Sequence, residues 1–448
     1  MRERFSQMFR LRPGEANLVL ALGFALFIND VTMGISKVVS VSGFLSAYKD
    51  YYILPVWAVD MALLILATGL QSLIIDRFHR LKLFGSLMIG LVILYGLLSV
   101  TFSINNFPLQ ISYTLLYLLT DQQWLIFPLI FWILVNDIFD PAQARRLFPV
   151  IGAFAFIGTV AGLLVAQLDA FLGFGAVKLL IFNAAVSLIV LIIVLAGLRK
   201  TPIRHNPQES ITISEALSGG WLFIREVPAF RYLSISMIAA GITITILLYD
   251  TLSDASLHFG DHFQSFYALY SLTIAVASIL IQFLSGKIIE KFGLKDSFVI
   301  LPFTMLIGTV TNFFVPGFAS SAAAQGLSRV VVQTVDQSSR KSFQAMVPAE
   351  KRGRVSLFID SYLPSLGTIL GSLITYSVIL WGIQGGIARQ IFTSYYLGLA
   401  IVAALVAVAS SLLMRSVYDQ SMFNWQLKRR SRGSSVMDKL DFSDSEKK

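Results

Sequence analysis

The sequence predicts an all-α polytopic membrane protein with twelve transmembrane helices in two six-helix bundles related by a parallel repeat. Composition, the number of apolar stretches and an internal repeat indicate this fold class. Of the 448 residues, 56% are hydrophobic and only 14% are charged, whereas a soluble domain carries about 25% charged residues. Such a chain has too few charges to cover a soluble surface, so most soluble enzyme classes are excluded. The absence of cysteine excludes disulfides and thiolate metal sites.

Twelve stretches are long enough to cross a bilayer, which takes about 20 mostly apolar residues per helix. The first six span residues 15–39, 51–75, 83–104, 110–137, 147–168 and 174–197. The second six span residues 230–256, 263–286, 296–316, 319–341, 354–381 and 389–414. The segment before them, Met1 to Pro13, is rich in arginine and lacks a small-residue cleavage site. We interpret it as a cytoplasmic anchor rather than a signal peptide.

The basic residues predict the orientation of these spans. One side receives the N-terminus, the tail and every inter-span loop that is rich in lysine and arginine. The other side receives only Lys49, Lys178 and Arg389, while Lys37 and Arg329 fall within spans. Because basic loops stay in the cytoplasm, both termini are expected to be cytoplasmic. The net charge of +9 therefore reflects cytoplasmic loops and does not indicate a nucleic-acid partner.

The two halves of the chain repeat each other. Asp76-Arg77-Phe78 follows span 2, and Glu290-Lys291-Phe292 follows span 8. A proline and two arginines separate spans 4 and 5, and the same pattern separates spans 10 and 11. Span 5 carries Gly158-x-x-x-Gly162, and span 11 carries Gly367-x-x-x-Gly371. Six helices repeated in parallel are the major facilitator architecture.

Four segments follow from this reading. Residues 1–197 form the first bundle, and residues 198–229 form a cytoplasmic linker with a short amphipathic helix, a plain interdomain linker being the alternative. Residues 230–415 form the second bundle. Residues 416–448 form a polar tail that is expected to be disordered.

The motifs of this chain resemble those of a broad superfamily and of one narrower family. The charged loops after spans 2 and 8, and Val347-Pro-Ala-Glu-Lys-Arg-Gly-Arg354, resemble the signature loops of the major facilitator superfamily. Phe131-Trp-Ile-Leu-Val-Asn-Asp137, followed by Ala144-Arg-Arg-Leu-Phe-Pro-Val-Ile-Gly152, resembles the ATP:ADP antiporter (nucleotide transporter) family. Val38-Val-Ser-Val-Ser-Gly43 and Ile359-Asp360 also stand where that family has similar residues.

The resemblance implies charged residues in spans 1, 4, 7 and 11 for nucleotide exchange, and this chain departs from that set. The span 1 lysine is out of register, although Lys37 lies a few residues on. The span 4 acid is replaced in Gln122-Gln123-Trp124, and the span 11 lysine by Thr368. The span 7 acid is present as Asp250. The resemblance therefore supports the family's fold for this chain more strongly than it supports the family's substrate.

Charged and polar residues within the spans are the candidate solute site. Each charge near the bilayer centre costs roughly 2.5–3.5 kcal/mol if it faces lipid, so these groups must face water or one another. Most lie in spans 1, 4, 7 and 10, which line the central cavity in the fold that the resemblance implies. The candidate cavity residues are Asp30, Lys37, Asp121, Gln122, Gln123, Asp250, Asp254, Gln325, Arg329, Gln333 and Asp336. Structural ion pairs such as Asp336 with Arg340 are the alternative reading.

A second set of residues is expected to control opening. Loop charges are predicted to form a cytoplasmic gate network, comprising Asp76, Arg77, Arg145, Arg146, Glu290, Lys291, Arg352 and Arg354. Gly158, Gly162, Gly367 and Gly371 are expected to permit close helix packing, either static or during rocking. His258 and His262 lie four residues apart, but we interpret them as part of an outward turn rather than as a metal site.

These observations predict a secondary transporter that works by alternating access, not an enzyme, and require no cofactor. No Walker A sequence is present, so ATP-driven pumping by this chain is not expected. The solute is a nucleotide exchanged as ATP for ADP, or another anionic metabolite. Proton-coupled transport of an unrelated solute, or a non-transporting scaffold with the same fold, are the alternatives. The protein is expected to be a monomer in the bacterial cytoplasmic (inner) membrane, with lipid, the solute and protons as its partners.

Overall fold

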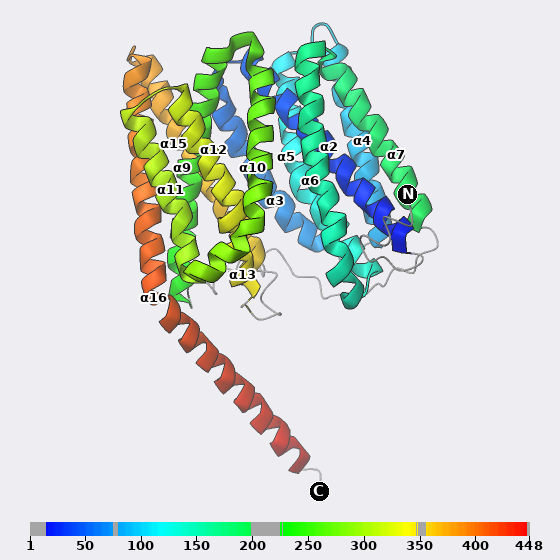
Figure 1. Ribbon diagram of the computed structural model, residues 1–448, viewed down its shortest axis with the longest axis vertical. Coiled ribbons are helices and arrows are strands. Elements are labelled where there is room, and N and C mark those ends of the chain that lie inside the picture. The colour runs from blue at the N-terminus through cyan, green and yellow to red at the C-terminus, as the bar shows by residue number, and fades with distance from the viewer. Residues whose placement is uncertain are drawn as a thin grey trace.

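The computed structural model describes residues 15–74, 79–198, 225, 227–345, 347 and 355–445, and these are almost entirely helical (Figure 1). The first half contains α2 (Glu15–Ala47), α3 (Ile53–Ile74), α4 (Arg80–Ser103), α5 (Leu109–Ile138), α6 (Pro141–Leu172) and α7 (Gly175–Leu198). The second half contains α9 (Pro228–Phe259), α10 (Phe263–Phe292), α11 (Leu294–Phe314), α12 (Phe318–Val331), α13 (Gln337–Ala345), α15 (Leu363–Gln384) and α16 (Arg389–Ser445). Two short 3-10 turns, η1 (Asp50–Tyr52) and η2 (Gly260–His262), connect helices at one end.

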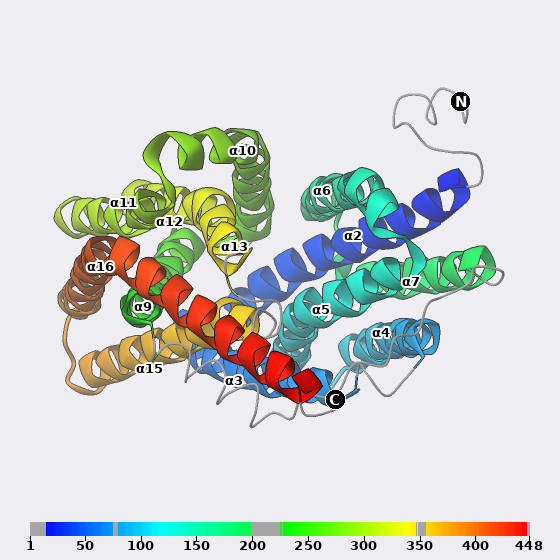
Figure 2. The ribbon, with the colours of Figure 1, turned by 90° about the horizontal axis from the view of Figure 1, so that it is seen from below.

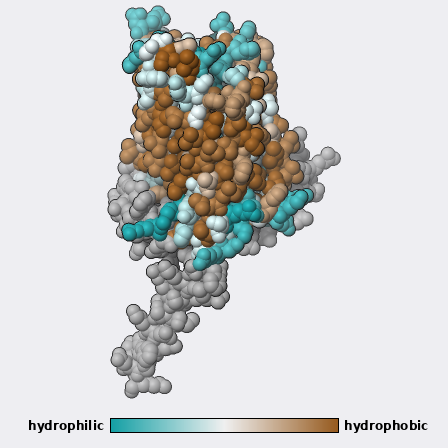
Figure 3. Space-filling view, turned by 90° about the vertical axis from the view of Figure 1, so that its left-hand side faces the viewer, coloured by the Kyte–Doolittle hydropathy of each residue, from teal (hydrophilic) through white to brown (hydrophobic). Residues whose placement is uncertain are grey.

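Ten segments of the described chain are long and apolar enough to cross a membrane. One of them, Pro228–Phe292, contains both α9 and α10. The predicted span 10 is not among the ten, because it is polar and is broken into α12, a π-helical stretch η3 (Val332–Asp336) and α13. With it, each predicted span corresponds to a helix in the described residues. An apolar belt between two polar ends is visible in Figure 3.

The helices in the two halves pack in the same way, as the repeat predicts. α2 packs against α6 and α7, and α9 packs correspondingly against α15 and α16. α4 pairs with α7 as α11 pairs with α16. Seen from below, α2 to α7 form one group and α9 to α16 form the other (Figure 2). The halves meet where α6 packs against α10 and where α3 packs against α15.

The repeated glycines lie at the tightest of these contacts. A Cβ atom at Gly158 would lie 2.3 Å from the Phe27 carbonyl oxygen, and one at Gly162 would lie 2.5 Å from the Val31 carbonyl oxygen. Both of those carbonyls belong to α2. In the second half, a Cβ at Gly367 would lie 2.6 Å from the Ile238 carbonyl oxygen of α9. A side chain at any of these positions would force the paired helices apart.

Apolar side chains from both halves meet at the end opposite the chain termini, which we call the distal end. The cluster includes Val41 and Phe44 of α2, Trp57 of α3, Leu252 of α9 and Tyr396 of α16, all at least nine-tenths buried. A second cluster lies among α2, α4, α5, α6 and α7 of the first half. A third surrounds Phe230 and Phe343 of the second half, and Ile65 of α3 packs against it. The distal cluster is therefore an apolar contact that joins the two bundles.

Several helices extend beyond the predicted spans. α2 continues to Ala47 rather than ending at residue 39. α16 continues to Ser445, so residues 416–445 are helical where a disordered tail was expected. Hydropathy does not mark a helix that leaves the membrane, and no proline follows Arg415 to interrupt this one. The predicted amphipathic helix in the linker lies outside the described residues.

Candidate functional site

A lysine from span 1 and an aspartate from span 4 meet between the helices of the first half. The Lys37 ammonium lies 2.6 Å from Asp121 Oδ1 and 4.0 Å from the centre of the Tyr117 ring. The Lys37 side chain keeps 29% of its surface exposed, and the Asp121 side chain keeps 19%. This cation is thus held by a carboxylate, while more than a quarter of its side-chain surface remains exposed.

A second carboxyl group lies behind this pair. Asp60 of α3 has no exposed surface. The Gln122 amide donates to its Oδ1 over 3.1 Å and contacts its backbone oxygen over 3.4 Å. Oδ2 has no hydrogen-bond partner among the described residues. Lys37, Asp121, Gln122 and Asp60 therefore form one group, which we call the central cluster.

Gln123, although adjacent, belongs to a different network. Its amide donates to Asn29 Oδ1 over 2.9 Å and to the Thr32 hydroxyl over 3.2 Å, and it accepts from the Tyr95 hydroxyl over 2.6 Å. The network continues to Ser36, whose hydroxyl donates to the Tyr95 hydroxyl. All of these groups are buried. Gln123 therefore holds α2, α4 and α5 together and does not line the central cluster.

Asp30 lies on the face of α2 that packs against α6. Its Cβ atom would be 3.0 Å from a Cβ at Gly158. Asp30 is half-buried, and it makes no hydrogen bond or ion pair within the described part of the chain. Its placement between two closely packed helices differs from that of Lys37, two turns further along.

The two span 7 acids, Asp250 and Asp254, contact partners in the second half. Asp250 is 2% exposed and accepts from the Asn312 amide of α11 and the Tyr396 hydroxyl of α16, each over 2.6 Å. Asp254 lies 3.5 Å from the Arg389 guanidinium. The structure therefore does not place either acid in the central cluster.

The polar stripe of span 10 faces α10 and the start of span 11. Gln325 pairs with Tyr270, and Gln333 accepts from Ser278 over 2.8 Å. Further down, Arg340 lies 2.9 Å from Asp336 and 3.6 Å from Asp360, and Lys341 lies 2.6 Å from Asp360. Asp360 belongs to the π-helical η4 (Phe358–Tyr362).

Arg329 is the exposed cation of this stripe. No hydrogen bond or ion pair joins it to another residue that the structure describes.

The distal end is tied by polar contacts as well as by the apolar cluster. Asp50 of η1 accepts from the Ser253 hydroxyl and, over 3.3 Å, from the Tyr249 hydroxyl, both on α9. The Arg389 guanidinium donates to the same Ser253 over 2.8 Å. The Asp50 contacts cross from the first half to the second, and the sequence analysis did not identify this role of Asp50.

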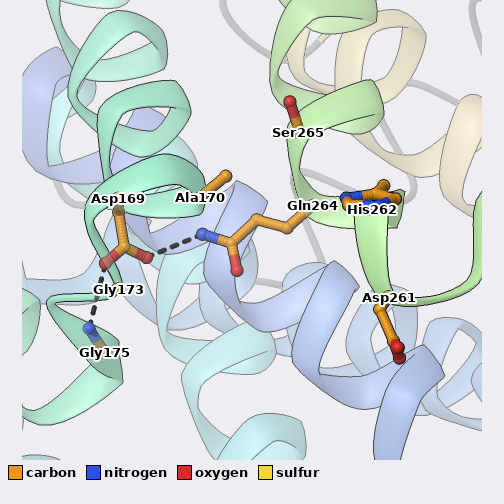
Figure 4. Close-up of a pocket in the computed structure, with 8 residues that line it drawn as sticks. All are labelled: Asp169, Ala170, Gly173, Gly175, Asp261, His262, Gln264 and Ser265. Atoms are coloured by element: carbon orange, nitrogen blue, oxygen red, sulfur yellow. Dashed lines mark hydrogen bonds between the residues drawn. The ribbon is translucent and has the colours of Figure 1, made fainter.

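A small cavity of about 230 Å³ opens between the α6–α7 turn and η2 (Figure 4). Across it, the Gln264 amide of α10 donates to Asp169 of α6 over 2.7 Å, and Gln167 donates to Ser265 over 2.8 Å. His262 and Asp261 line the cavity. No group of residues suited to holding a metal ion occurs in the described chain.

The predicted gate charges lie largely outside the described side chains. Asp76, Arg77, Arg352 and Arg354 fall outside the described residues, as does the side chain of Arg145. Arg146 lies 2.7 Å from Glu15, which joins the starts of α6 and α2 within one half.

Glu290 and Lys291 are exposed, and the Lys291 ammonium lies 5.8 Å from the Phe292 ring centre. Sequence reasoning missed a second pair at this end, in which Arg80 lies 3.2 Å from Asp137.

Solved structures share this fold at low sequence identity. A bacterial homologue of the human lysosomal transporter Spinster, inward-facing and unoccupied, has a TM-score of 0.63 and 14% identity, covering 92% of this chain and 98% of its own. The nucleoside transporter NupG has a TM-score of 0.61 and 16% identity, covering 88% and 99%. A bacterial homologue of the iron transporter ferroportin, inward-facing, has a TM-score of 0.61 and 14% identity, covering 89% and 98%.

A comparison with curated proteins found no match. A family model described as TLC ATP/ADP transporter matches residues 95–335, which is more than half of the chain. The matched region runs from α4 to η3 and includes Asp121 and Arg329. Together with the major facilitator fold, this match shows that the chain belongs to the TLC ATP/ADP transporter family.

Proposed function

We propose that the protein exchanges ATP and ADP across a bacterial cytoplasmic membrane, with the phosphate groups held by Lys37 and Arg329. The family match supports a nucleotide substrate. The observation that carries the site is the Lys37–Asp121 pair, because it presents a partly exposed ammonium beside a tyrosine ring in the interior of the bundle. A phosphate oxygen can replace the carboxylate as the partner of this ammonium.

Alternating access would move this site between the two sides of the membrane. The distal apolar cluster and the Asp50 and Asp169 contacts close one end, which the distribution of basic residues predicts to be the outside. Opening would separate the halves there and close the opposite end, where Asp76, Arg77, Glu290, Lys291, Arg352 and Arg354 are proposed to act. The close α2–α6 and α9–α15 packing supports movement of each half as a unit.

Each half supplies part of the site within a single chain, which supports a monomer as the transporting unit.

The acids of the central cluster also favour a second candidate function. Asp121 and the fully buried Asp60 both belong to that cluster, so proton-coupled transport of a different solute would use it. A scaffold without transport would have no use for an exposed cation such as Arg329.

The test is uptake of labelled ADP into proteoliposomes preloaded with unlabelled ATP, with and without an imposed pH gradient. Saturable uptake that requires internal ATP is expected. Uptake that requires only the pH gradient would favour the proton-coupled candidate, and absence of uptake of any nucleotide by well-inserted protein would refute nucleotide exchange.

Charge-removing variants connect this activity to the proposed site. Lys37→Gln and Arg329→Gln are each expected to raise the KM for ADP roughly 10- to 100-fold, because a hydrogen bond to a charged group contributes about 1.5–3 kcal/mol. Lys178→Gln is the matched control, since Lys178 is exposed at the start of α7 near the distal end. Equal KM values in all three variants would show that neither Lys37 nor Arg329 belongs to the binding site.

A further inference from the structure

Five polar residues form one connected contact at the distal end, which we call the distal latch. Asp50 of η1 comes from the first half, and the second half supplies Tyr249, Ser253 and Asp254 of α9 and Arg389 of α16. The Arg389 guanidinium donates to the Ser253 hydroxyl over 2.8 Å, and that hydroxyl donates to the Asp50 carboxylate. Arg389 is therefore linked to the first half through a single hydroxyl group.

The charges of the distal latch do not balance. Arg389 lies 3.5 Å from Asp254 and is joined to Asp50 through Ser253, so one guanidinium serves two carboxylates. Among the lysines and arginines of the described chain, Arg389 alone makes an ion pair or a side-chain hydrogen bond within the latch. The Tyr249 hydroxyl, over 3.3 Å, is a neutral donor to Asp50. Arg389 is thus the cation on which the latch depends.

This cation keeps exposed surface and unused donors. The Arg389 side chain is 40% exposed, whereas Ser253 is 1% exposed. A guanidinium carries five N–H donors on three nitrogens. Both contacts of Arg389 with described residues use Nη2. A planar guanidinium with donors to spare suits the oxygens of a phosphate group, which it can bind in a bidentate manner.

We propose that Arg389 is an outer capture site for a phosphate group of the solute, and that the solute opens the distal end by competing with Asp50 for this cation. The proposal rests on the anionic solute of the proposed function and on the outward orientation of the distal end that the basic residues predict. A ligand shifts a conformational balance only if it binds one of the two states more tightly. The latch provides such a difference at Arg389.

An anion on Arg389 meets different charges in the two states. While the distal end is closed, the Asp50 carboxylate lies two hydrogen bonds away through Ser253, so it repels an added phosphate group. When the halves separate at this end, Asp50 leaves with the first half, and Arg389 binds the anion more tightly. Because linkage is reciprocal, closing returns Asp50 and weakens the hold of Arg389 on the anion. The solute is then released toward Lys37.

The test uses the full-length protein in right-side-out proteoliposomes, with one cysteine introduced as Val41→Cys into the cysteine-free chain. Val41 belongs to the distal cluster and is 2% exposed, so its reaction with an impermeant maleimide reports opening of that end. Pyrophosphate, ADP or adenosine is added outside. Pyrophosphate and ADP should accelerate the labelling, and adenosine should not, because it carries no phosphate. A lower half-maximal concentration for ADP than for pyrophosphate would assign the site to a nucleotide, and equal values would assign it to the phosphate group alone.

Variants of the Val41→Cys protein assign the effect to a residue. Arg389→Gln should raise the half-maximal pyrophosphate concentration roughly 10-fold or more, because a hydrogen bond between charged groups is lost, and Arg389→Lys should restore part of the response. Lys178→Gln is the matched control, since Lys178 is another exposed cation near this end, and it should respond as the parent does. In Lys37→Gln, which lacks the deeper cation, pyrophosphate should still accelerate the labelling.

Three outcomes would overturn the proposal. One is an unchanged half-maximal concentration in Arg389→Gln, and another is a parent protein that responds to neither pyrophosphate nor ADP. The third is a response that is lost in Lys37→Gln, which would place the anion in the central cluster. Pyrophosphate probes the latch without any transport. If the protein takes up no ADP while pyrophosphate still acts through Arg389, nucleotide exchange fails as the function and the capture site stands.

Discussion

Adding one methyl group at Gly158 should destabilise the first half of the protein. A Cβ there would lie 2.3 Å from the Phe27 carbonyl oxygen and 3.0 Å from the Asp30 Cβ. Ordinary contacts of this kind lie near 3.5 Å, so α6 would have to retreat from α2 by about 1 Å. Overpacking of this size costs about 1–3 kcal/mol. α2 and α6 pack along much of their length, so a shift of one helix affects the whole contact. Gly158→Ala should therefore lower the free energy of unfolding by this amount.

Gly152 provides a matched control on the same helix. A Cβ at Gly152 would meet nothing within 4 Å. Gly152→Ala should therefore be neutral or stabilising by up to about 1 kcal/mol, because alanine favours the helix over glycine. The assay is thermal unfolding of the purified variants in one detergent, followed by ATP–ADP exchange. We expect the order Gly152→Ala, wild type, Gly158→Ala in decreasing Tm. If Gly158→Ala unfolds at the same temperature as Gly152→Ala, the close approach of α2 and α6 does not contribute as argued.

Three further predictions follow. Asp250→Ala should lose about 2–5 kcal/mol of stability, because the Asn312 and Tyr396 donors are left buried without an acceptor. Asp250→Asn should lose less. Equal Tm values of Asp250→Ala and the wild type would show that these bonds contribute nothing. Asp50→Ala should loosen the distal end, so that a single cysteine introduced as Val41→Cys, 2% exposed in an otherwise cysteine-free chain, reacts faster with an impermeant maleimide; an unchanged rate would contradict the role of Asp50. Single asparagine replacements of Asp30, Asp121 and Asp250 should reveal a coupling residue by loss of gradient-driven accumulation with exchange kept, and unchanged accumulation in all three would exclude them.

The fold could be predicted from the sequence because burial in lipid leaves a strong signal. Each apolar stretch of about 20 residues became a helix, and the glycine pairs marked the α2–α6 and α9–α15 contacts. Helix ends were less predictable, since hydropathy stops at the membrane surface while backbone hydrogen bonding continues, as in α2 to Ala47. The polar span 10 was recognised as a span, but its π-helical interruption at Val332–Asp336 left no mark in composition.

The sequence yields candidate site residues but not the contacts that they make. Lys37 and Asp121 were both candidates, yet they are 84 positions apart and nothing in either helix shows that they pair. Gln122 and Gln123 look alike in sequence, although helix rotation sends one to Asp60 and the other to Tyr95. Asp250 is buried as expected, but only the packing of α11 and α16 shows that its partners are Asn312 and Tyr396.

The distal apolar cluster gives the transport cycle a thermal signature. Opening that end would expose the side chains around Phe44, Trp57 and Leu252 to water, and hydration of apolar surface raises the heat capacity. The balance between the two access states would therefore follow a curved van 't Hoff plot. Because apolar association weakens on cooling, low temperature would shift the population toward the state in which this end is open.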